Sequence, residues 1–156
     1  MHRLAINYSD FDALADDILS SGGSFQFIAT GNSMWPFVRN GAQLTVTKAD
    51  PGSLRKGDIV LYKSGELLAV HRVVKKTRND IGYLFHIQGD GCFDNGETVE
   101  EDCVIGHVIG VEQDGVFLSK RIIRSIMFVE LVRKIRQILW YVKVGSRLVT
   151  RSGVQR

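Results

Sequence analysis

Ser33 is the first residue of this chain whose type and setting could do chemistry. It lies in the turn sequence Gly-Asn-Ser-Met-Trp-Pro, in which Gly31 permits a tight turn and Pro36 restricts the exit. A serine hydroxyl becomes a nucleophile when a general base takes its proton. Taken alone, Ser33 is best interpreted as an ordinary surface serine, because turns favour serine in any case.

A general base is available at His71, within the apolar sequence Leu-Ala-Val-His-Arg-Val-Val. The unperturbed pKa of histidine, about 6.5, suits it to move protons near neutral pH. The alternative is a histidine in the core or at a sheet edge that is satisfied by a backbone group. Arg72 would point to the opposite face of the strand, and we expect it to be solvated.

Two acids, Asp90 and Asp94, lie in the glycine-rich loop Gln-Gly-Asp-Gly-Cys-Phe-Asp-Asn. Either carboxylate could accept a hydrogen bond from a histidine ring and fix its tautomer, or the acids could form an Asx-turn. A calcium site is disfavoured, because the spacing does not fit an EF-hand and the ligands are too few. Cys92 and Cys103 match no metal-binding spacing and cannot form a disulfide framework. We therefore expect no metal and no cofactor.

The elements that must position these residues follow from the hydrophobic periodicity. Residues 10–20 have apolar residues at helical spacing and predict a short amphipathic helix. Beyond it, the pattern changes to short runs rich in Val, Ile, Leu, Phe and Thr, separated by turn signals. The predicted strands are 25–30, 43–47, 59–63, 67–75, 83–88, 104–111 and 115–119. No helical pattern separates them, so we expect a mostly β fold of compact antiparallel sheets or a partly closed barrel.

The C-terminal segment differs from the rest in both period and charge. Apolar residues from Phe128 to Val142 fall on one helical face and basic residues dominate the other, which predicts a basic amphipathic helix. Residues 1–119 carry ten Lys and Arg against sixteen Asp and Glu, a net charge of −6, whereas residues 120–156 carry ten against one, a net charge of +9. The chain thus divides into a β domain over 1–119 and a helical tail over 120–156. This split excludes a uniformly basic nucleic-acid binder.

The N-terminal sequence turns acidic where a signal peptide would need its apolar run. The sequence has no window of about 18 uncharged apolar residues, so we expect no transmembrane helix. With 156 residues the chain has the length of one ordinary domain. We expect a cytoplasmic protein or one bound peripherally to a membrane.

Five segments, in this order, resemble the boxes of the type I signal peptidase superfamily, the serine peptidases that also include the self-cleaving repressors. They are similar to its Ser-Met-x-Pro nucleophile box, its Gly-Asp-(Ile/Val)-Val strand, the box of the Lys or His base, its Gly-Asp…Asp box and its closing Val-(Ile/Leu)-Gly-x-Val strand. The segments are 31–36, 54–60, 70–74, Gly89-Asp90 with Asp94, and 104–110. The resemblance runs from Phe25 to Val111, and the histidine makes the chain most similar to the endoplasmic-reticulum and archaeal types.

The resemblance implies a serine endopeptidase that cleaves a leader or precursor peptide after small residues. It implies that Ser33 is the nucleophile, that His71 is the base, and that Asp90 or Asp94 orients the imidazole. Of the two acids, Asp90 matches its box better. The backbone N–H of Ser33 would contribute to the oxyanion hole. The chain departs from many signal peptidases at Gly31, where they have a serine.

Two other functions stay open on the same fold. One is a catalytically silent peptide-binding domain, although the presence of Ser33, His71 and two acids together argues against it. The other is a repressor-like self-cleaving regulator. It is disfavoured because the chain has no helix-turn-helix segment, no Ala-Gly pair for self-cleavage, and a histidine where those proteins use lysine.

Residues 120–149 allow three interpretations. The apolar face of the tail helix could pack on the β domain, lie in an anionic membrane surface, or dock on a partner protein. Packing and membrane contact have equal weight. Nucleic acid is disfavoured as a partner, because aromatic residues do not alternate with the basic ones.

Overall fold

The computed structural model describes residues 17–65, 67–92 and 95–125, together with Leu131, Lys134, Ile135 and Ile138. Its strands are β1 (Ser24–Ile28), β2 (Gln43–Lys48), β3 (Ile59–Ser64), β4 (Leu67–Arg78), β5 (Tyr83–Gln88), β6 (Glu97–Glu100), β7 (Val104–Gln113) and β8 (Val116–Ser119). A short 3₁₀ helix, Glu101–Cys103, precedes β7, and the helix α2 (Lys120–Ile123) follows β8. Residues 17–20 are also helical.

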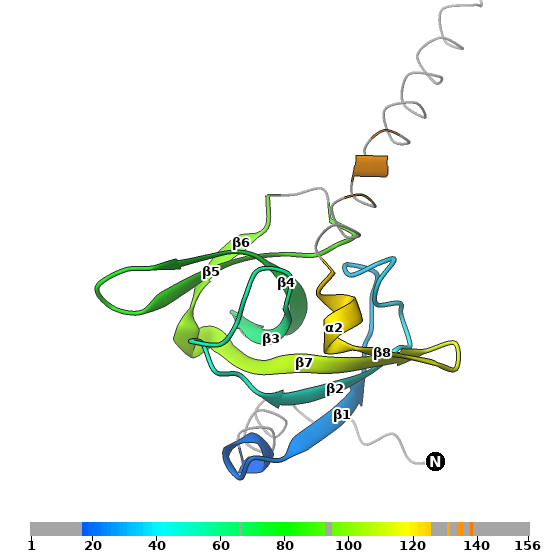
Figure 1. Ribbon diagram of the computed structural model, residues 1–156, viewed down its shortest axis with the longest axis horizontal. Helices are drawn as coiled ribbons and strands as arrows, with labels where there is room; N and C mark the ends of the chain where they lie inside the picture. Colours follow the sequence, from blue (N-terminus) through cyan, green and yellow to red (C-terminus); the bar gives the residue numbers. More distant parts are fainter. Residues whose placement is uncertain are drawn as a thin grey trace, which may run out of the picture. The chain divides into compact units, whose positions relative to one another are not determined.

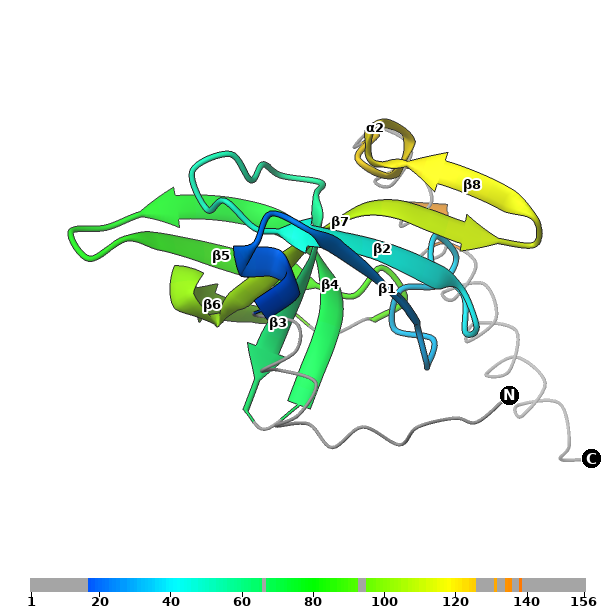
Figure 2. The same ribbon diagram turned by 90° about the horizontal axis from the view of Figure 1, so that it is seen from below.

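The strands form one antiparallel sheet that curls into a half-barrel (Figures 1 and 2). Their order across the sheet is β1-β2-β7-β3-β4-β5-β6, and β8 pairs with β7 outside this path. The strand pairs that build it are all antiparallel in the described part of the chain. The expected mostly β fold with a partly closed sheet is confirmed.

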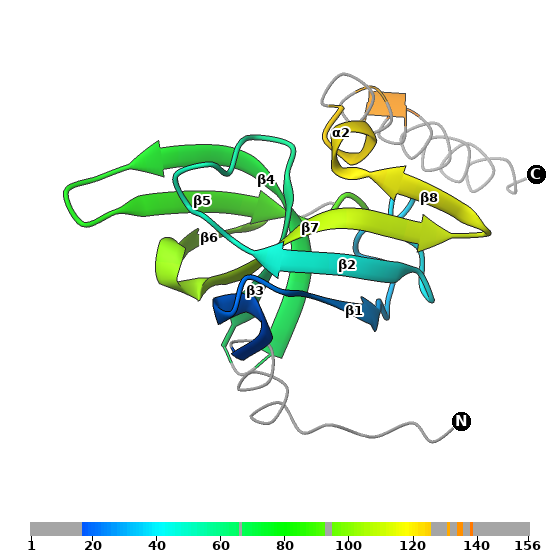
Figure 3. The ribbon, with the colours of Figure 1, turned by 60° about the horizontal axis from the view of Figure 1, so that its bottom comes forward.

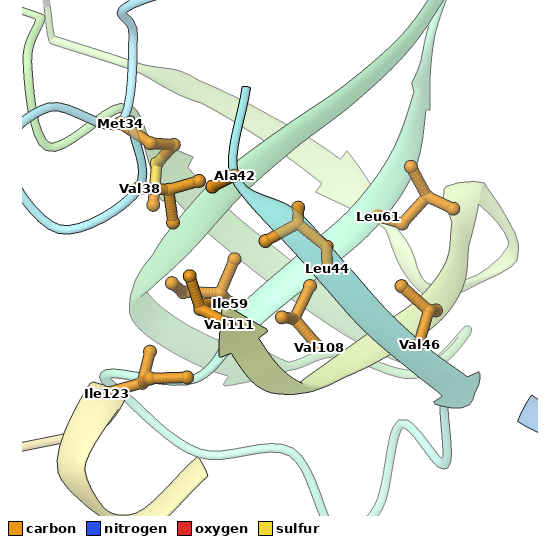
Figure 4. Packing of buried hydrophobic residues seen from close by; sticks show 10 residues of the cluster. All are labelled: Met34, Val38, Ala42, Leu44, Val46, Ile59, Leu61, Val108, Val111 and Ile123. Carbon is orange, nitrogen blue, oxygen red and sulfur yellow. The ribbon is translucent and has the colours of Figure 1, made fainter. Parts of the chain in front are cut away.

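Strand β3 joins two hydrophobic clusters, because it is buried on both faces. Ile59 and Leu61 belong to the first cluster, whereas Val60 and Tyr62 belong to the second. This division follows from the alternation of side chains along a strand. Figure 4 shows the first cluster, in which residues from the loop between β1 and β2 meet residues of β2, β3, β7 and α2. The loop that carries Ser33 is therefore anchored in a core.

Each predicted strand is present in the structure with similar bounds, but the sequence did not predict β6. Strand β4 continues to Arg78, beyond the predicted end at residue 75. Strand β6 reads Glu-Thr-Val-Glu and buries Val99 alone among its four residues, so it lacks the apolar alternation that indicates a strand. It forms by pairing with β5, where Val99 lies opposite the buried Phe85.

The two predicted helices are described in part. The helix predicted over 10–20 is helical at residues 17–20, where Leu19 is buried, and its earlier part lies outside the described residues. The helix predicted over 128–142 is helical at Leu131, Lys134, Ile135 and Ile138, and its other positions lie outside the described residues. No helix of the described chain is long and apolar enough to cross a membrane.

The chain forms two compact units, one that ends at Arg124 and one that begins at Ser125. Strand β8 turns back along β7 and leads into α2, which belongs to the first unit (Figure 3). Ile123 of α2 is buried in the first hydrophobic cluster. The first residues of the basic segment therefore pack with the β structure, although the charge pattern placed its boundary at residue 120.

Candidate active site

Ser33 lies in the loop between β1 and β2, and the residues around it fix the shape of this loop. Gly31 has a φ of +90°, a left-handed conformation that glycine adopts without strain. Its N–H donates a hydrogen bond to Asn40 Oδ1 at 3.0 Å. Met34 is buried in the first hydrophobic cluster, whereas Ser33 itself is exposed. The loop thus holds the serine hydroxyl at the surface on an anchored backbone.

A second loop, between β5 and β6, packs directly against Ser33. The N–H of Gly91 donates to the Ser33 carbonyl oxygen at 2.6 Å. A Cβ atom at Gly91 would lie 2.5 Å from the Asn32 carbonyl oxygen, and one at Gly89 would lie 2.6 Å from that of Ser33. Distances this short exclude a side chain, so the glycines of this loop are required for its close approach to the nucleophile loop.

His71 is brought to the same place from strand β4. Its Nε2 atom lies 3.2 Å from the position that a Cβ atom would take at Gly89, next to the Ser33 carbonyl. On the other side of the ring, Nδ1 lies 2.8 Å from the Tyr62 hydroxyl. The structure therefore places the imidazole at the junction of the two loops.

The hydroxyl and the backbone N–H of Ser33 make no hydrogen bond within the described part of the chain. The serine is thus brought near the histidine without a hydrogen bond between them. In enzymes without a bound substrate such hydrogen bonds are often long, and they tighten when substrate binds. The N–H of Ser33 can serve as an oxyanion donor, because the carbonyl of the same peptide unit, that of Asn32, accepts a hydrogen bond from the Trp35 N–H at 3.1 Å and so helps to hold this peptide in place.

Asp90 takes part in a buried ion pair with Arg72. The arginine Nε donates to both carboxylate oxygens of Asp90, at 2.9 and 3.1 Å, and its Nη2 donates to Oδ2 at 2.6 Å. Nη1 donates to the backbone carbonyls of Gly57 and Ile123. The expectation of a solvated Arg72 is wrong: this side chain is 2% exposed, and its burial is possible because Asp90 and two backbone carbonyls accept hydrogen bonds from all three of its nitrogens.

The predicted site residues are thus only partly brought together. Ser33, His71 and the backbone of the Asp90 loop meet, but the hydrogen bond described at Nδ1 joins His71 to Tyr62, and the Asp90 carboxylate lies against Arg72. Asp94 lies outside the described residues. That Asp90 or Asp94 orients the imidazole of His71 stays a prediction.

Sequence reasoning missed Tyr62 and its partner Glu97. The Tyr62 hydroxyl donates to Glu97 Oε1 at 2.5 Å, and Ser64 Oγ lies 3.2 and 3.3 Å from the two oxygens of the same carboxylate. A tyrosine at the end of the apolar run Ile-Val-Leu-Tyr was a weak signal, because a buried tyrosine needs a partner for its hydroxyl.

An apolar cleft of about 490 Å³ opens beside Ser33. It lies between β1, the loop that follows it, β3 and the beginning of β4. Apart from the hydroxyl groups of Thr30 and Ser33, its side chains are apolar. They are contributed by Phe27, Ile28, Ala29, Met34, Val38, Leu61, Leu68, Ala69 and Val70. The cleft suits an uncharged, largely apolar chain segment.

Asp58 is a second buried acid, and it follows Gly57, whose carbonyl accepts a hydrogen bond from Arg72. Asp58 Oδ1 is 3.6 Å from His107 Nε2, too far for a hydrogen bond, and both atoms are buried. Burial raises the pKa of the Asp58 carboxyl, but the neighbouring His107 and the N–H of Arg55 more than offset this and hold the pKa below its ordinary value. Lys120 contributes in the same direction. Asp58 is thus favoured as a carboxylate in the folded state.

No family model matches this chain, and no curated protein matches it. Among the described residues, no group of three or more His, Cys, Asp and Glu could hold a metal ion. The functional assignment therefore depends on the geometry of the site itself.

Proposed function

We propose that this protein is a serine endopeptidase in which Ser33 is the nucleophile and His71 is the general base. The observation that carries this proposal is the position of His71, whose Nε2 lies against the Gly89 backbone at the point where that loop touches Ser33. The resemblance of the five sequence segments to the signal peptidase superfamily agrees with it.

The reaction follows from these groups. Ser33 Oγ attacks the scissile carbonyl carbon while His71 Nε2 takes its proton, and the developing oxyanion accepts a hydrogen bond from the Ser33 N–H. The imidazolium then gives this proton to the leaving amine, which leaves an acyl-serine. Water then attacks the ester carbonyl while the same ring takes one of its protons, and the imidazolium gives this proton to Ser33 Oγ as the acid product leaves. General base catalysis of this kind contributes about 10²–10⁴ to the rate.

The substrate would be an extended leader or precursor peptide that lies in the apolar cleft. Residues 67–71 of β4 pair with β3 on one side, whereas β4 pairs with β5 from Arg72 onward. Within the described part of the chain, no strand pairs with the other backbone edge of residues 67–70, so an extended peptide could add there, next to Leu68 and Val70 of the cleft. A peptide bound there would run towards Ser33, and the lining favours uncharged side chains.

A phosphonate probe that phosphonylates active-site serines is expected to label the wild-type chain and not the Ser33→Ala variant. Mass spectrometry of the intact protein measures the labelling, and peptide mapping locates it. The matched control is Ser53→Ala, because Ser53 is also an exposed loop serine. Equal labelling of wild type and Ser33→Ala would remove Ser33 from the mechanism. A fully folded wild type that is never labelled would favour the silent peptide-binding domain.

We also propose that the basic tail binds an anionic membrane surface. Leu131, Ile135 and Ile138 are spaced along one face of the helix and are 55%, 47% and 61% exposed. Lys134, on the same helix, is exposed as well. Exposed apolar residues at helical spacing, together with the +9 charge of the segment, are typical of helices that lie in a membrane interface.

Vesicles that contain phosphatidylserine are expected to carry the wild-type chain upward in a flotation gradient, and neutral phosphatidylcholine vesicles are not. Replacing Leu131, Ile135 and Ile138 together by serine should strongly reduce flotation, because it removes three large side chains of the apolar face and keeps every charge. The control replaces the exposed Val116 and Phe117 of β8 by serine. Flotation that survives the tail substitutions would rule out this use of the helix.

A further inference from the structure

A chain of hydrogen bonds runs from His71 through Tyr62 to a carboxylate on another strand. The Tyr62 hydroxyl lies 2.8 Å from His71 Nδ1 and donates to Glu97 Oε1 at 2.5 Å. Ser64, two residues after Tyr62 on β3, places its hydroxyl against the same carboxylate. Glu97 is thus held by two hydroxyl groups of β3.

The curl of the sheet makes this contact possible. Strands β4 and β5 separate β3 from β6 in the order of the sheet, so in a flat sheet Glu97 could not reach Tyr62. Tyr62 is fully buried in the second hydrophobic cluster, and its ring lies 5.7 Å from that of His71. Hydrogen bonds in such a low-dielectric setting are stronger than in water.

The direction of these bonds determines which ring nitrogen of neutral His71 carries the proton. A carboxylate accepts only, and Tyr62 has one hydroxyl proton, which goes to Glu97. The Tyr62 oxygen can therefore interact with Nδ1 only as an acceptor, so Nδ1 carries the ring proton. The lone pair of the neutral ring is then on Nε2, the atom that faces the Gly89 backbone beside Ser33.

We propose that Glu97, acting through Tyr62, is the acidic member of this site. It keeps the proton of neutral His71 on Nδ1, and its negative charge stabilises the imidazolium that forms when Nε2 takes the proton of Ser33. This inference rests on the proposed function. Tyr62 and Glu97 do not touch the reacting atoms and are positioning residues. Their arrangement supplies the role that a triad aspartate has, while the Asp90 carboxylate holds Arg72.

The test is the tautomer of His71, measured by long-range ¹H–¹⁵N correlation NMR at a pH where the ring is neutral. In the wild type we expect the proton on Nδ1. In Glu97→Leu, which leaves no acceptor on this side chain, the Tyr62 hydroxyl can donate to Nδ1, so the ring proton should shift to Nε2. The matched control is Glu100→Leu, an exposed position on the same strand, which should keep the wild-type tautomer. Tyr62→Phe removes the oxygen that accepts from Nδ1 and should shift the proton in the same direction, so it provides a second variant if Glu97→Leu does not fold.

Peptide hydrolysis gives an independent measurement. Glu97→Gln should lower kcat by about 10- to 100-fold, as loss of a supporting hydrogen-bond partner commonly does, with KM unchanged. Glu97→Asp should recover part of the loss. A His71 tautomer that is the same in wild type and Glu97→Leu would overturn the inference, even in an active enzyme. If the wild type is inactive and unlabelled, the proposed function fails, yet the tautomer measurement still decides the role of Glu97.

Discussion

Replacing Arg72 by methionine is expected to lower the free energy of unfolding by about 3–5 kcal/mol. The new side chain is apolar and of similar length, but it leaves the buried Asp90 carboxylate without a counter-charge. The carbonyls of Gly57 and Ile123 lose a donor in the same substitution. Removing one partner of a buried pair is costly mainly because the other charge stays in a low dielectric.

Urea unfolding followed by circular dichroism measures this loss. The matched control is Arg39→Met, which breaks an ion pair with Asp114 whose side chains are 54% and 68% exposed. Exposed pairs of this kind contribute at most about 1 kcal/mol. The double variant Arg72→Met with Asp90→Leu should recover much of the stability, because no buried charge is left. Equal losses for Arg72→Met and Arg39→Met would show that the buried pair does not have the role described.

Gly89→Ala is expected to slow labelling of Ser33 and peptide hydrolysis by about 10²-fold or more. The added methyl group would lie 2.6 Å from the Ser33 carbonyl oxygen and 3.2 Å from His71 Nε2, so the two groups must move apart. A displacement of about 1 Å at the reacting groups commonly costs this much in rate. The substitution changes no charge and removes no hydrogen-bonding group.

The rate of probe labelling and kcat/KM for a peptide are measured for Gly89→Ala beside Gly52→Ala. A Cβ atom at Gly52 would meet only the Asp50 side chain, at 3.3 Å, in the loop between β2 and β3. Gly52→Ala should therefore keep wild-type activity. If Gly89→Ala is folded and fully active, the contact between the two loops does not position the catalytic groups.

The sequence predicted the fold well because most strands carry their own signal. Runs such as residues 59–63 combine β-branched and aromatic residues with turn residues at both ends, and they are strands in the structure. Strand β6 has no such signal. It is a strand because β5 offers it a pairing edge, and that edge is a property of the folded sheet.

The candidate site was predictable only where its residues lie in unusual local sequences. Ser33 lies in such a turn, and His71 stands out as a polar residue in an apolar run. Glu97 has no local signal, since its contact with Tyr62 depends on the curl of the whole sheet. Arg72 was misjudged for the same reason: strand alternation gives the face on which a side chain lies, but not the Asp90 carboxylate that meets it there.

Strand β7 also determines when this site can form during synthesis. It pairs with β2, β3 and β8, so that Thr45 has Gly110 as its partner and Val60 has His107. Pairings between such distant positions must wait for the later strand to leave the ribosome, and they slow folding. The loop of Ser33 is therefore made long before the strands that shape the sheet around it, and the nascent chain carries the serine before β4 and the loop of Gly89 can pack beside it.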